Sequence, residues 1–260
     1  MDADDTGQLR LSDTRVWLVP AVAVVAAIAI LLTGTNERIF LLINRLGPAS
    51  NDWIWSDLTV LGDTMVALAL CLPLARRRPD LLWAVLPAAL LATAWVHIYK
   101  PILDVTRPPG VLAPDAFHVI GPAHHYHSFP SGHTTTAFAL AGLCVFGLNL
   151  RAWSAVPLAI AVCVALSRVV VGVHWPLDIL AGACGGWLAA AVGLKLSARM
   201  HLGQHPFVQW LTAAAFAGCA IALVVGYDAG YADAIWFQRG IGAASLVAFF
   251  LTFVSTQKGG

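Results

Sequence analysis

The chain has 260 residues, of which 59% are hydrophobic and 11% charged, and its mean hydropathy is +0.76. Soluble domains carry about 25% charged residues, so the composition excludes an ordinary soluble protein and predicts an integral membrane protein embedded in the lipid bilayer. With a net charge of +1 and only short basic runs, the sequence also excludes nucleic acid as a partner.

Eight apolar segments are candidates for membrane-spanning helices, each of which needs about 20 apolar residues. In chain order they are residues 16–33, 57–75, 81–99, 133–150, 153–171, 176–196, 206–226 and 237–255. This pattern predicts an all-α fold, a polytopic transmembrane helical bundle. A cleaved signal peptide is the alternative for the first segment, but its acidic start and long apolar run favour an uncleaved anchor.

The connecting segments indicate how the chain is oriented. Residues 36–56 mix arginine and tryptophan with apolar residues, which predicts a helix lying in the membrane interface. The basic residues of alternate connections and of the chain ends are Arg10, Arg15, Arg76, Arg77, Arg78, Arg151, Lys195, Arg199 and Lys258. If the spans alternate in direction, these residues share one side, which the positive-inside rule makes cytoplasmic. The three polar clusters described next then lie at the outer face.

The first cluster, residues 100–108 (KPILDVTRP), carries two cations. Pro101 biases Lys100 away from helical geometry, so the chain is expected to turn there, and the prolines after Arg107 predict extended backbone. Both heads are expected at the water boundary, where a lysine point charge and a planar guanidinium can bind phosphate oxygens. A lone cation at this depth is more often a lipid anchor, but several facing one compartment favour a site.

The second cluster, residues 129–133 (FPSGH), is typical of a loop that enters a helix. A helix amino terminus offers free N–H groups and a positive dipole end, and Gly132 lets an anion approach the backbone. The Ser131 hydroxyl is a further donor. The alternative is that Ser131 is an N-cap without chemical importance.

The third cluster, residues 167–178 (SRVVVGVHWPLD), combines a cation, a histidine and a carboxylate. Pro176 suits the first turn of a helix, and the four-residue spacing can bring His174 and Asp178 together. Asp178 is then expected to accept the Nδ1 proton of His174, which leaves the Nε2 lone pair outward. Such an imidazole is a nucleophile or a base, and Arg168 is a third cation for an anionic substrate.

Together these motifs resemble the phosphatidic acid phosphatase type 2 (PAP2) superfamily, which includes membrane lipid phosphatases and vanadium haloperoxidases. The matching patterns are K-x6-RP, PSGH and SR-x5-H-x3-D, and the resemblance covers about residues 30–200. It implies a core of six transmembrane helices. Residues 1–200 would form the catalytic transmembrane domain, and residues 201–260 a two-helix extension that carries no motif.

The resemblance also implies a role for each motif residue. His174 would attack phosphorus and form a phosphohistidine, Asp178 would orient His174, and His133 would protonate the leaving oxygen and later activate water. No metal and no other cofactor would be needed. The implied phosphate-binding groups are Lys100, Arg107, Ser131, Gly132 and Arg168.

The expected function is a metal-independent phosphatase for a membrane lipid phosphate, with its site at the outer face of a bacterial cytoplasmic (inner) membrane. Undecaprenyl diphosphate ranks first as substrate, followed by phosphatidylglycerophosphate or phosphatidate and then lipid A phosphate. Lipid phosphotransfer would use the same residues and stays open. Eight spans argue against a haloperoxidase, and charges gathered at one interface without a repeat argue against an anion transporter.

Three features have no assigned role. His124, His125 and His127 precede the second cluster and are candidates for lining the pocket entrance or touching a head group, while a metal site lacks a defined ligand geometry. The last two spans have three open roles: packing, homo-oligomerisation or a lateral wall for lipid. Gly182 and Gly186 form a GxxxG pattern that favours close helix packing.

Overall fold

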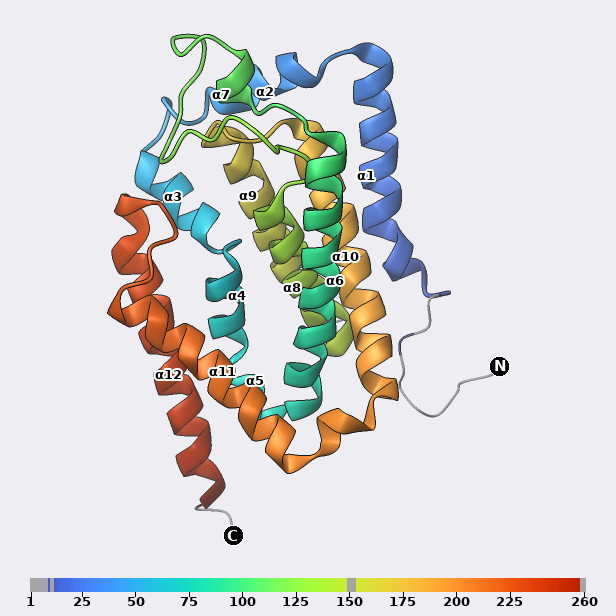
Figure 1. Ribbon diagram of the computed structural model, residues 1–260, viewed down its shortest axis with the longest axis vertical. Coiled ribbons are helices and arrows are strands. Elements are labelled where there is room, and N and C mark those ends of the chain that lie inside the picture. The colour runs from blue at the N-terminus through green and yellow to red at the C-terminus, as the bar shows by residue number, and fades with distance from the viewer. Residues whose placement is uncertain (1–8, 10–11, 149–152, 258–260) are drawn as a thin grey trace.

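A computed structural model of the chain describes residue 9 and residues 12–148 and 153–257 (Figure 1). Within these ranges all regular elements are helices, so the all-α transmembrane bundle is confirmed. Arg10, Arg151 and Lys258, which entered the orientation argument, lie outside the described residues.

Seven of the eight predicted spans each form one helix. They are α1 (Thr14–Thr33), α6 (Pro79–Leu103), α8 (Gly132–Gly147), α9 (Ala155–Val170), α10 (Pro176–Arg199), α11 (Pro206–Val225) and α12 (Ile235–Gln257). Five of them are long and apolar enough to cross a bilayer alone, whereas α8 and α9 have 16 residues each, just under the usual length of about 17–25. The outer faces of most of these helices carry exposed apolar side chains, such as Leu32 of α1, which is 84% exposed. Such faces suit contact with lipid.

The predicted span 57–75 is wrong as a single helix. The chain instead forms α3 (Asp52–Val60) and α4 (Thr64–Cys71), bent by 63° at the break. Asp63 caps α4 by accepting from Met65 N and Val66 N, and a Cβ on Gly62 would lie 2.8 Å from the carbonyl oxygen of His133. The break therefore lets this part of the chain pass directly against the start of α8.

The interface helix predicted over 36–56 is likewise divided. Its first part is α2 (Asn36–Asn44), and its last residues begin α3. Asn44 is buried at the end of α2 and donates to the carbonyl oxygens of His118 and Val170, both at 2.8 Å. The interfacial segment is therefore fastened to the turn that follows α9.

Helix α10 runs through the middle of the bundle and packs closely on α8 and α6 (Figure 1). A Cβ on Gly182 would lie 2.7 Å from Ser131 O, and one on Gly186 would lie 2.1 Å from Thr135 O. The GxxxG pattern thus marks a close helix contact within the chain, as expected. On the opposite face α1 packs against α10, where Trp187 Nε1 donates to Arg15 O at 3.1 Å.

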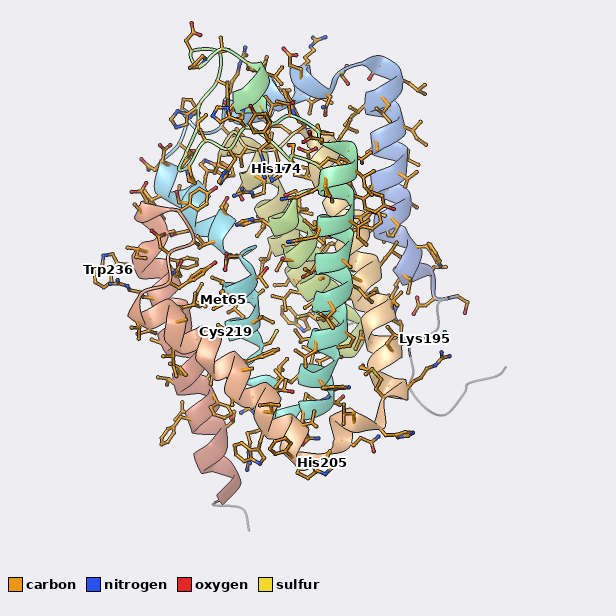
Figure 2. The ribbon with its side chains drawn as sticks, viewed as in Figure 1. Met65, His174, Lys195, His205, Cys219 and Trp236 are labelled. Atoms are coloured by element: carbon orange, nitrogen blue, oxygen red, sulfur yellow. The ribbon has the colours of Figure 1, made fainter. Side chains whose placement is uncertain are left out.

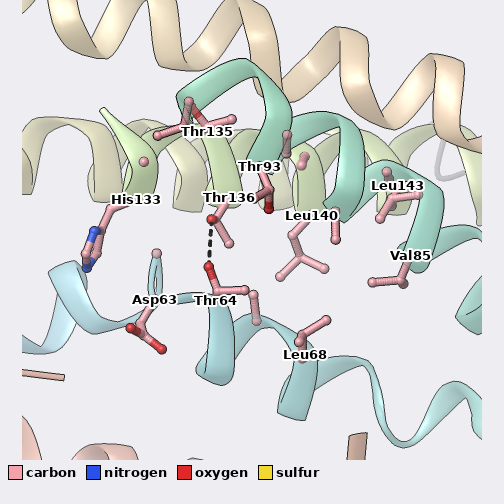
Figure 3. A pocket seen from close by; sticks show the side chains of 18 of the residues that line it. Asp63, Thr64, Leu68, Val85, Thr93, His133, Thr135, Thr136, Leu140 and Leu143 are labelled. Carbon is pink, nitrogen blue, oxygen red and sulfur yellow. Dashed lines mark hydrogen bonds between the residues drawn. The ribbon is translucent and has the colours of Figure 1, made fainter. Parts of the chain in front are cut away.

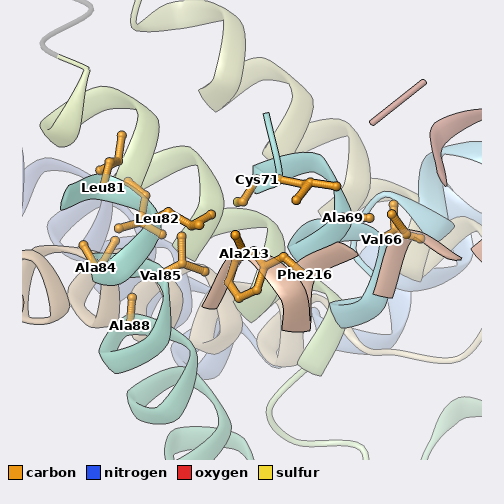
Figure 4. Close-up of a cluster of buried hydrophobic side chains, with 14 of the residues drawn as sticks. Val66, Ala69, Cys71, Leu81, Leu82, Ala84, Val85, Ala88, Ala213 and Phe216 are labelled. Atoms are coloured by element: carbon orange, nitrogen blue, oxygen red, sulfur yellow. The ribbon is translucent and has the colours of Figure 1, made fainter. Parts of the chain in front are cut away.

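The last two helices form a hairpin against α4. Ala213 and Phe216 of α11 share a buried cluster with Val66 of α4 and Leu82 of α6 (Figure 4). Helices α11 and α12 therefore contribute to the same core as the rest of the bundle, while the domain boundary at residue 200 stays a prediction.

The loops that carry the three motifs lie at one end of the bundle. His174 lies at this end, and Lys195 of α10 lies toward the other (Figure 2). The short helix α7 (Pro108–Val111) belongs to the first group of loops, whereas α5 (Leu74–Arg77) lies at the far end (Figure 1).

Candidate active site

Three backbone hydrogen bonds join the motif segments to one another. Arg107 N donates to His125 O at 2.8 Å, Ser128 N to Val105 O at 2.8 Å, and Ser131 N to Asp178 O at 3.1 Å. The first two pair the ends of the long α6–α8 connection, and the third ties the start of α8 to the first turn of α10. The three sequence clusters are therefore brought together at one end of the bundle.

His174 and Asp178 form the contact that their spacing predicted. His174 Nδ1 lies 3.3 Å from Asp178 Oδ2, and the two side chains are only 2% and 1% exposed. The same carboxylate oxygen accepts from Trp175 N at 2.7 Å and from Ser128 Oγ at 2.5 Å. Asp178 is thus held from three sides, which fixes the orientation of the histidine ring.

The tautomer of His174 follows from its second neighbour. Arg107 Nη1 lies 3.3 Å from His174 Nε2. A guanidinium can only donate, so Nε2 accepts and Nδ1 carries the proton toward Asp178, as predicted. Burial, together with the charges of Arg107, Arg168 and Lys100, lowers the pKa of His174 well below its ordinary value, so the ring is neutral at pH 7.

The guanidinium of Arg107 does not lie at the water boundary, where it was expected. It is 8% exposed, and its donors reach backbone carbonyl oxygens at Tyr126 (2.8 Å), Val173 (3.2 Å) and His127 (3.4 Å). A cation in this position first has to satisfy buried carbonyl groups of two loops. Arg107 therefore fastens these loops around His174 as well as presenting charge to it.

Lys100 also differs from the prediction, because Pro101 does not end the helix. Helix α6 continues to Leu103 and ends at Asp104, whose φ of 39° is left-handed and whose N–H reaches Lys100 O. Proline removes one hydrogen bond, a loss that is confined here to the last turn. Lys100 consequently projects from a helix, and it lines a cavity with Gly132 and His133.

Arg168 is buried in the last turn of α9 and is 3% exposed. Its Nη1 donates to the hydroxyl of Tyr231 at 2.7 Å. Its Nε is buried and has no hydrogen-bond partner within the described part of the chain. Such a donor indicates a site for an anionic group.

The PSGH segment forms the predicted loop-to-helix junction. Ser131 caps α8 by accepting from Thr134 N at 3.4 Å and is fully buried, so the capping alternative is realised and its contact with phosphate stays a prediction. A Cβ on Gly132 would meet nothing closer than 3.8 Å, which leaves the backbone open to the cavity. His133 Nε2 is buried without a partner among the described residues.

A cavity of about 210 Å³ extends from these groups into the bundle between α4, α6 and α8 (Figure 3). Its polar end is formed by Lys100, Gly132, His133 and Asp63, and its far end by apolar side chains such as Leu140 and Leu143. A weak contact of 3.4 Å between the hydroxyls of Thr64 and Thr136 bridges the middle. The cavity therefore joins a charged centre to an apolar interior.

The three unassigned histidines of the α6–α8 connection are exposed. His125 Nδ1 lies 3.1 Å from Pro109 O, and His127 Nδ1 lies 3.1 Å from Asp104 Oδ1. Partial burial and then the charge of Arg107 lower the pKa of His124. Over the described ranges no three His, Cys, Asp or Glu side chains gather as a metal site would require.

Sequence reasoning missed Ser128, Asn44 and Tyr231. Ser128 lies three residues before Ser131 and resembles any loop serine, and Asn44 is one of two asparagines in an interfacial helix. Tyr231 lies 63 residues from Arg168, in a connection without a motif. Their contacts cross between distant segments, so no local spacing could have marked them.

Residues 81–198 match the family described as the PAP2 superfamily. The undecaprenyl-diphosphatase of Sulfolobus acidocaldarius is 30% identical over 161 residues, which cover 60% of this chain and 76% of that protein. The chain belongs to the PAP2 superfamily. The lipid A 1-phosphatase of Rhizobium etli is 37% identical over 92 residues, 32% of this chain. The match covers 39% of that relative, so the chain spans about two fifths of its length.

A solved structure extends the PAP2 assignment to the fold. The crystal structure of Aquifex aeolicus LpxE aligns with a TM-score of 0.55 and 30% identity, covering 62% of this chain and 94% of that one. The expected PAP2-like transmembrane bundle is thus confirmed.

Proposed function

We propose that this PAP2 protein is a membrane lipid phosphatase that works through a phosphohistidine on His174. The observation that carries the proposal is the junction of two environments. Lys100, Gly132 and His133, together with the Asp63 carboxylate, form the polar end of a cavity whose walls are otherwise largely apolar. A soluble phosphate ester needs no such apolar space, whereas a lipid phosphate fills both parts.

In the first step His174 Nε2 attacks phosphorus, the bond from phosphorus to the leaving oxygen breaks, and the protonated ring of His133 gives its proton to that oxygen. The leaving oxygen is the ester oxygen of a lipid monophosphate or the bridging oxygen of a lipid diphosphate. Asp178, 3.3 Å from Nδ1, stabilises the positive imidazole that forms. In the second step His133 takes a proton from water, the water oxygen attacks phosphorus, and the N–P bond breaks. The products are inorganic phosphate and the dephosphorylated lipid, and splitting the displacement in two lowers each barrier.

Fixed positive charge supplies the electrostatic stabilisation in this proposal, without a metal. Arg168 Nε would donate to a phosphate oxygen, and Lys100 would bind another as a point charge. Arg107, which contacts Nε2 at 3.3 Å, would transfer that donor to the phosphoryl group and free the lone pair for attack. The Gly132 amide lies at the positive end of α8.

For the substrate we favour a polyprenyl diphosphate, with undecaprenyl diphosphate first. The cavity that adjoins the site suits one extended chain better than the several chains of a glycerophospholipid or of lipid A. The name of the Sulfolobus relative supports this choice, and the Rhizobium relative makes lipid A phosphate the second candidate. The site would face outward from a bacterial inner membrane, because Lys195 and Arg199 mark the far end of α10.

The test is a comparison of specificity constants for the purified protein in one detergent. The substrates are undecaprenyl diphosphate, phosphatidylglycerophosphate, phosphatidate and lipid A, with His174→Ala as the inactive control. The highest kcat/KM is expected for undecaprenyl diphosphate, with the monophosphate as the lipid product.

Three other results are informative. A preference for a glycerophospholipid or lipid A contradicts the polyprenyl assignment alone. Label that passes to a second lipid instead of to inorganic phosphate shows a phosphotransferase. Failure of a folded protein to act on any of the four contradicts the phosphatase.

A further inference from the structure

The connection between α11 and α12 reaches the candidate active site through one side chain. Tyr231 is 4% exposed, and its hydroxyl accepts a hydrogen bond from Arg168 Nη1 at 2.7 Å. The match to the PAP2 superfamily ends at residue 198, so this contact comes from the extension and not from the family core.

The connection is held in place by side chains on both flanks. Tyr227 donates its hydroxyl to Asp63 Oδ2 at 2.8 Å. Gln238 of α12 accepts from Ala229 N at 3.2 Å and donates to Tyr227 O. These bonds define the path of the backbone on either side of Tyr231.

The ring of Tyr231 is also held in place, by packing against neighbouring side chains and a loop. It lies in a buried cluster with Val60, Ile120, Val171 and Val173. Gly121 has a φ of +76°, and a Cβ there would lie 2.7 Å from Tyr231 Cε1, so the loop can pass the ring only as glycine. The hydroxyl is therefore presented to Arg168 from a rigid support.

The chemistry of the contact matters as much as its position. A phenol hydroxyl accepts from a guanidinium without neutralising it, whereas a carboxylate would cancel its charge. Arg168 has no carboxylate within ion-pairing distance in the described ranges, and its buried Nε has no partner there. Arg168 is thus oriented by a neutral group and keeps a free donor.

We propose that Tyr231 is a positioning residue that holds Arg168 for a phosphoryl group, so that the C-terminal helix pair completes the phosphate site. The proposal rests on the proposed function for the nature of the ligand. It assigns the extension a role in the site beyond the three considered from sequence. The ring of Tyr231 also lies near Arg168, whose Cζ is 5.8 Å from the ring centroid, but the hydrogen bond that orients the guanidinium belongs to the hydroxyl.

Tyr231→Phe separates the two roles, because it removes the hydroxyl and keeps the ring against Gly121. Tyr227→Phe is the matched control: it removes a hydroxyl from the same connection, but one that binds Asp63. For both full-length variants in detergent we would measure the unfolding midpoint, the binding of orthovanadate and inorganic phosphate by titration calorimetry, and kcat and KM.

A hydrogen bond to a charged group is worth enough to change an equilibrium by roughly tenfold or more. Tyr231→Phe is expected to weaken vanadate and phosphate binding by roughly tenfold. Tyr227→Phe should shift the unfolding midpoint about as much as Tyr231→Phe does, but it should change vanadate and phosphate binding much less. Equal binding by Tyr231→Phe and wild type overturns the proposal, as does an equal loss in both variants.

Arg168→Lys, alone and combined with Tyr231→Phe, tests whether the tyrosine acts through the arginine. The combined variant is expected to bind vanadate little worse than Arg168→Lys alone; fully additive losses contradict the proposal. If wild type binds vanadate and phosphate but releases no phosphate from lipids, the proposed function fails while this inference stands.

Discussion

Asp178 Oδ2 accepts from Ser128 Oγ, Trp175 N and His174 Nδ1 at 2.5, 2.7 and 3.3 Å. The first two donors belong to a loop and to the helix start, so the carboxylate is fixed before it orients the imidazole. On the other side of the ring, Arg107 contacts Nε2. His174 is therefore placed between an anion that stabilises its charged form and a cation that opposes it until substrate arrives.

His174→Ala is expected to abolish turnover, because it removes the atom that bonds to phosphorus in the proposed mechanism. Asp178→Asn should keep the fold and slow catalysis strongly by disturbing the tautomer. The measurement is phosphate release, combined with rapid quenching at neutral or alkaline pH after a labelled substrate, which should trap label on His174. Near wild-type release by His174→Ala contradicts the covalent mechanism.

Ser128→Ala should lower kcat by roughly tenfold, because Asp178 loses a charge-assisted hydrogen bond. Ser197→Ala is the matched control, since its hydroxyl binds Leu194 O near the opposite end of α10. Steady-state kinetics on both variants decide the matter. Equal activity of the two would show that Ser128 only fills space.

The pH dependence follows from the lowered pKa of His174. Burial and then the neighbouring positive charges oppose the imidazolium, so the neutral nucleophile persists below the ordinary pKa of 6.5, and the acid limb of kcat should lie below pH 6.5. Lys100→Gln removes one of these charges, so the pKa should rise and the limb should move to higher pH. His124→Gln is the control. If the acid limb of kcat disappears in His124→Gln, that limb reports the titration of His124 and not of His174.

At the scale of elements, glycines set how closely helix α8 is approached. Gly186 of α10 faces Thr135 O with no room for a Cβ, whereas a Cβ on Gly132 at the start of α8 would meet nothing closer than Val96 Cγ1 at 3.8 Å. The two glycines therefore have different roles: Gly186 permits close helix packing, and Gly132 leaves the cavity accessible. The break between α3 and α4 serves the same region, because Gly62 passes against His133.

Gly132→Ala should fold normally and raise KM several-fold, because its methyl group enters the space beside Lys100. Gly186→Ala should instead lower the unfolding midpoint, since overpacking against backbone costs about 1–3 kcal/mol. Thermal unfolding in detergent and kinetics on both variants test the contrast. A destabilised Gly132→Ala with unchanged KM would contradict it.

At the scale of the whole molecule, the candidate active site and the basic connections lie at opposite ends. Helix α10 begins beside His174 and ends with Lys195 and Arg199 in its last turns (Figure 2). The core that holds this arrangement includes α11. A lipid phosphate would therefore meet the site at one membrane face only.

Single cysteines at Ala116 and Arg77 test which face that is, in a background without the five native cysteines. Both positions are exposed, and they lie at opposite ends of the bundle. An impermeant thiol reagent applied to intact cells is expected to label Ala116→Cys and not Arg77→Cys. The reverse pattern would invert the topology.

The sequence by itself determined the helical bundle, most helix positions and the contact between His174 and Asp178. These depend on local properties, namely the length of apolar runs and a four-residue spacing at a helix start. Only the tertiary structure decided that Arg107 is buried among loop carbonyls, that Ser128 supports Asp178 and that Tyr231 holds Arg168. Those contacts join segments 19 to 67 residues apart, and such pairings depend on how helices pack, which no local pattern encodes.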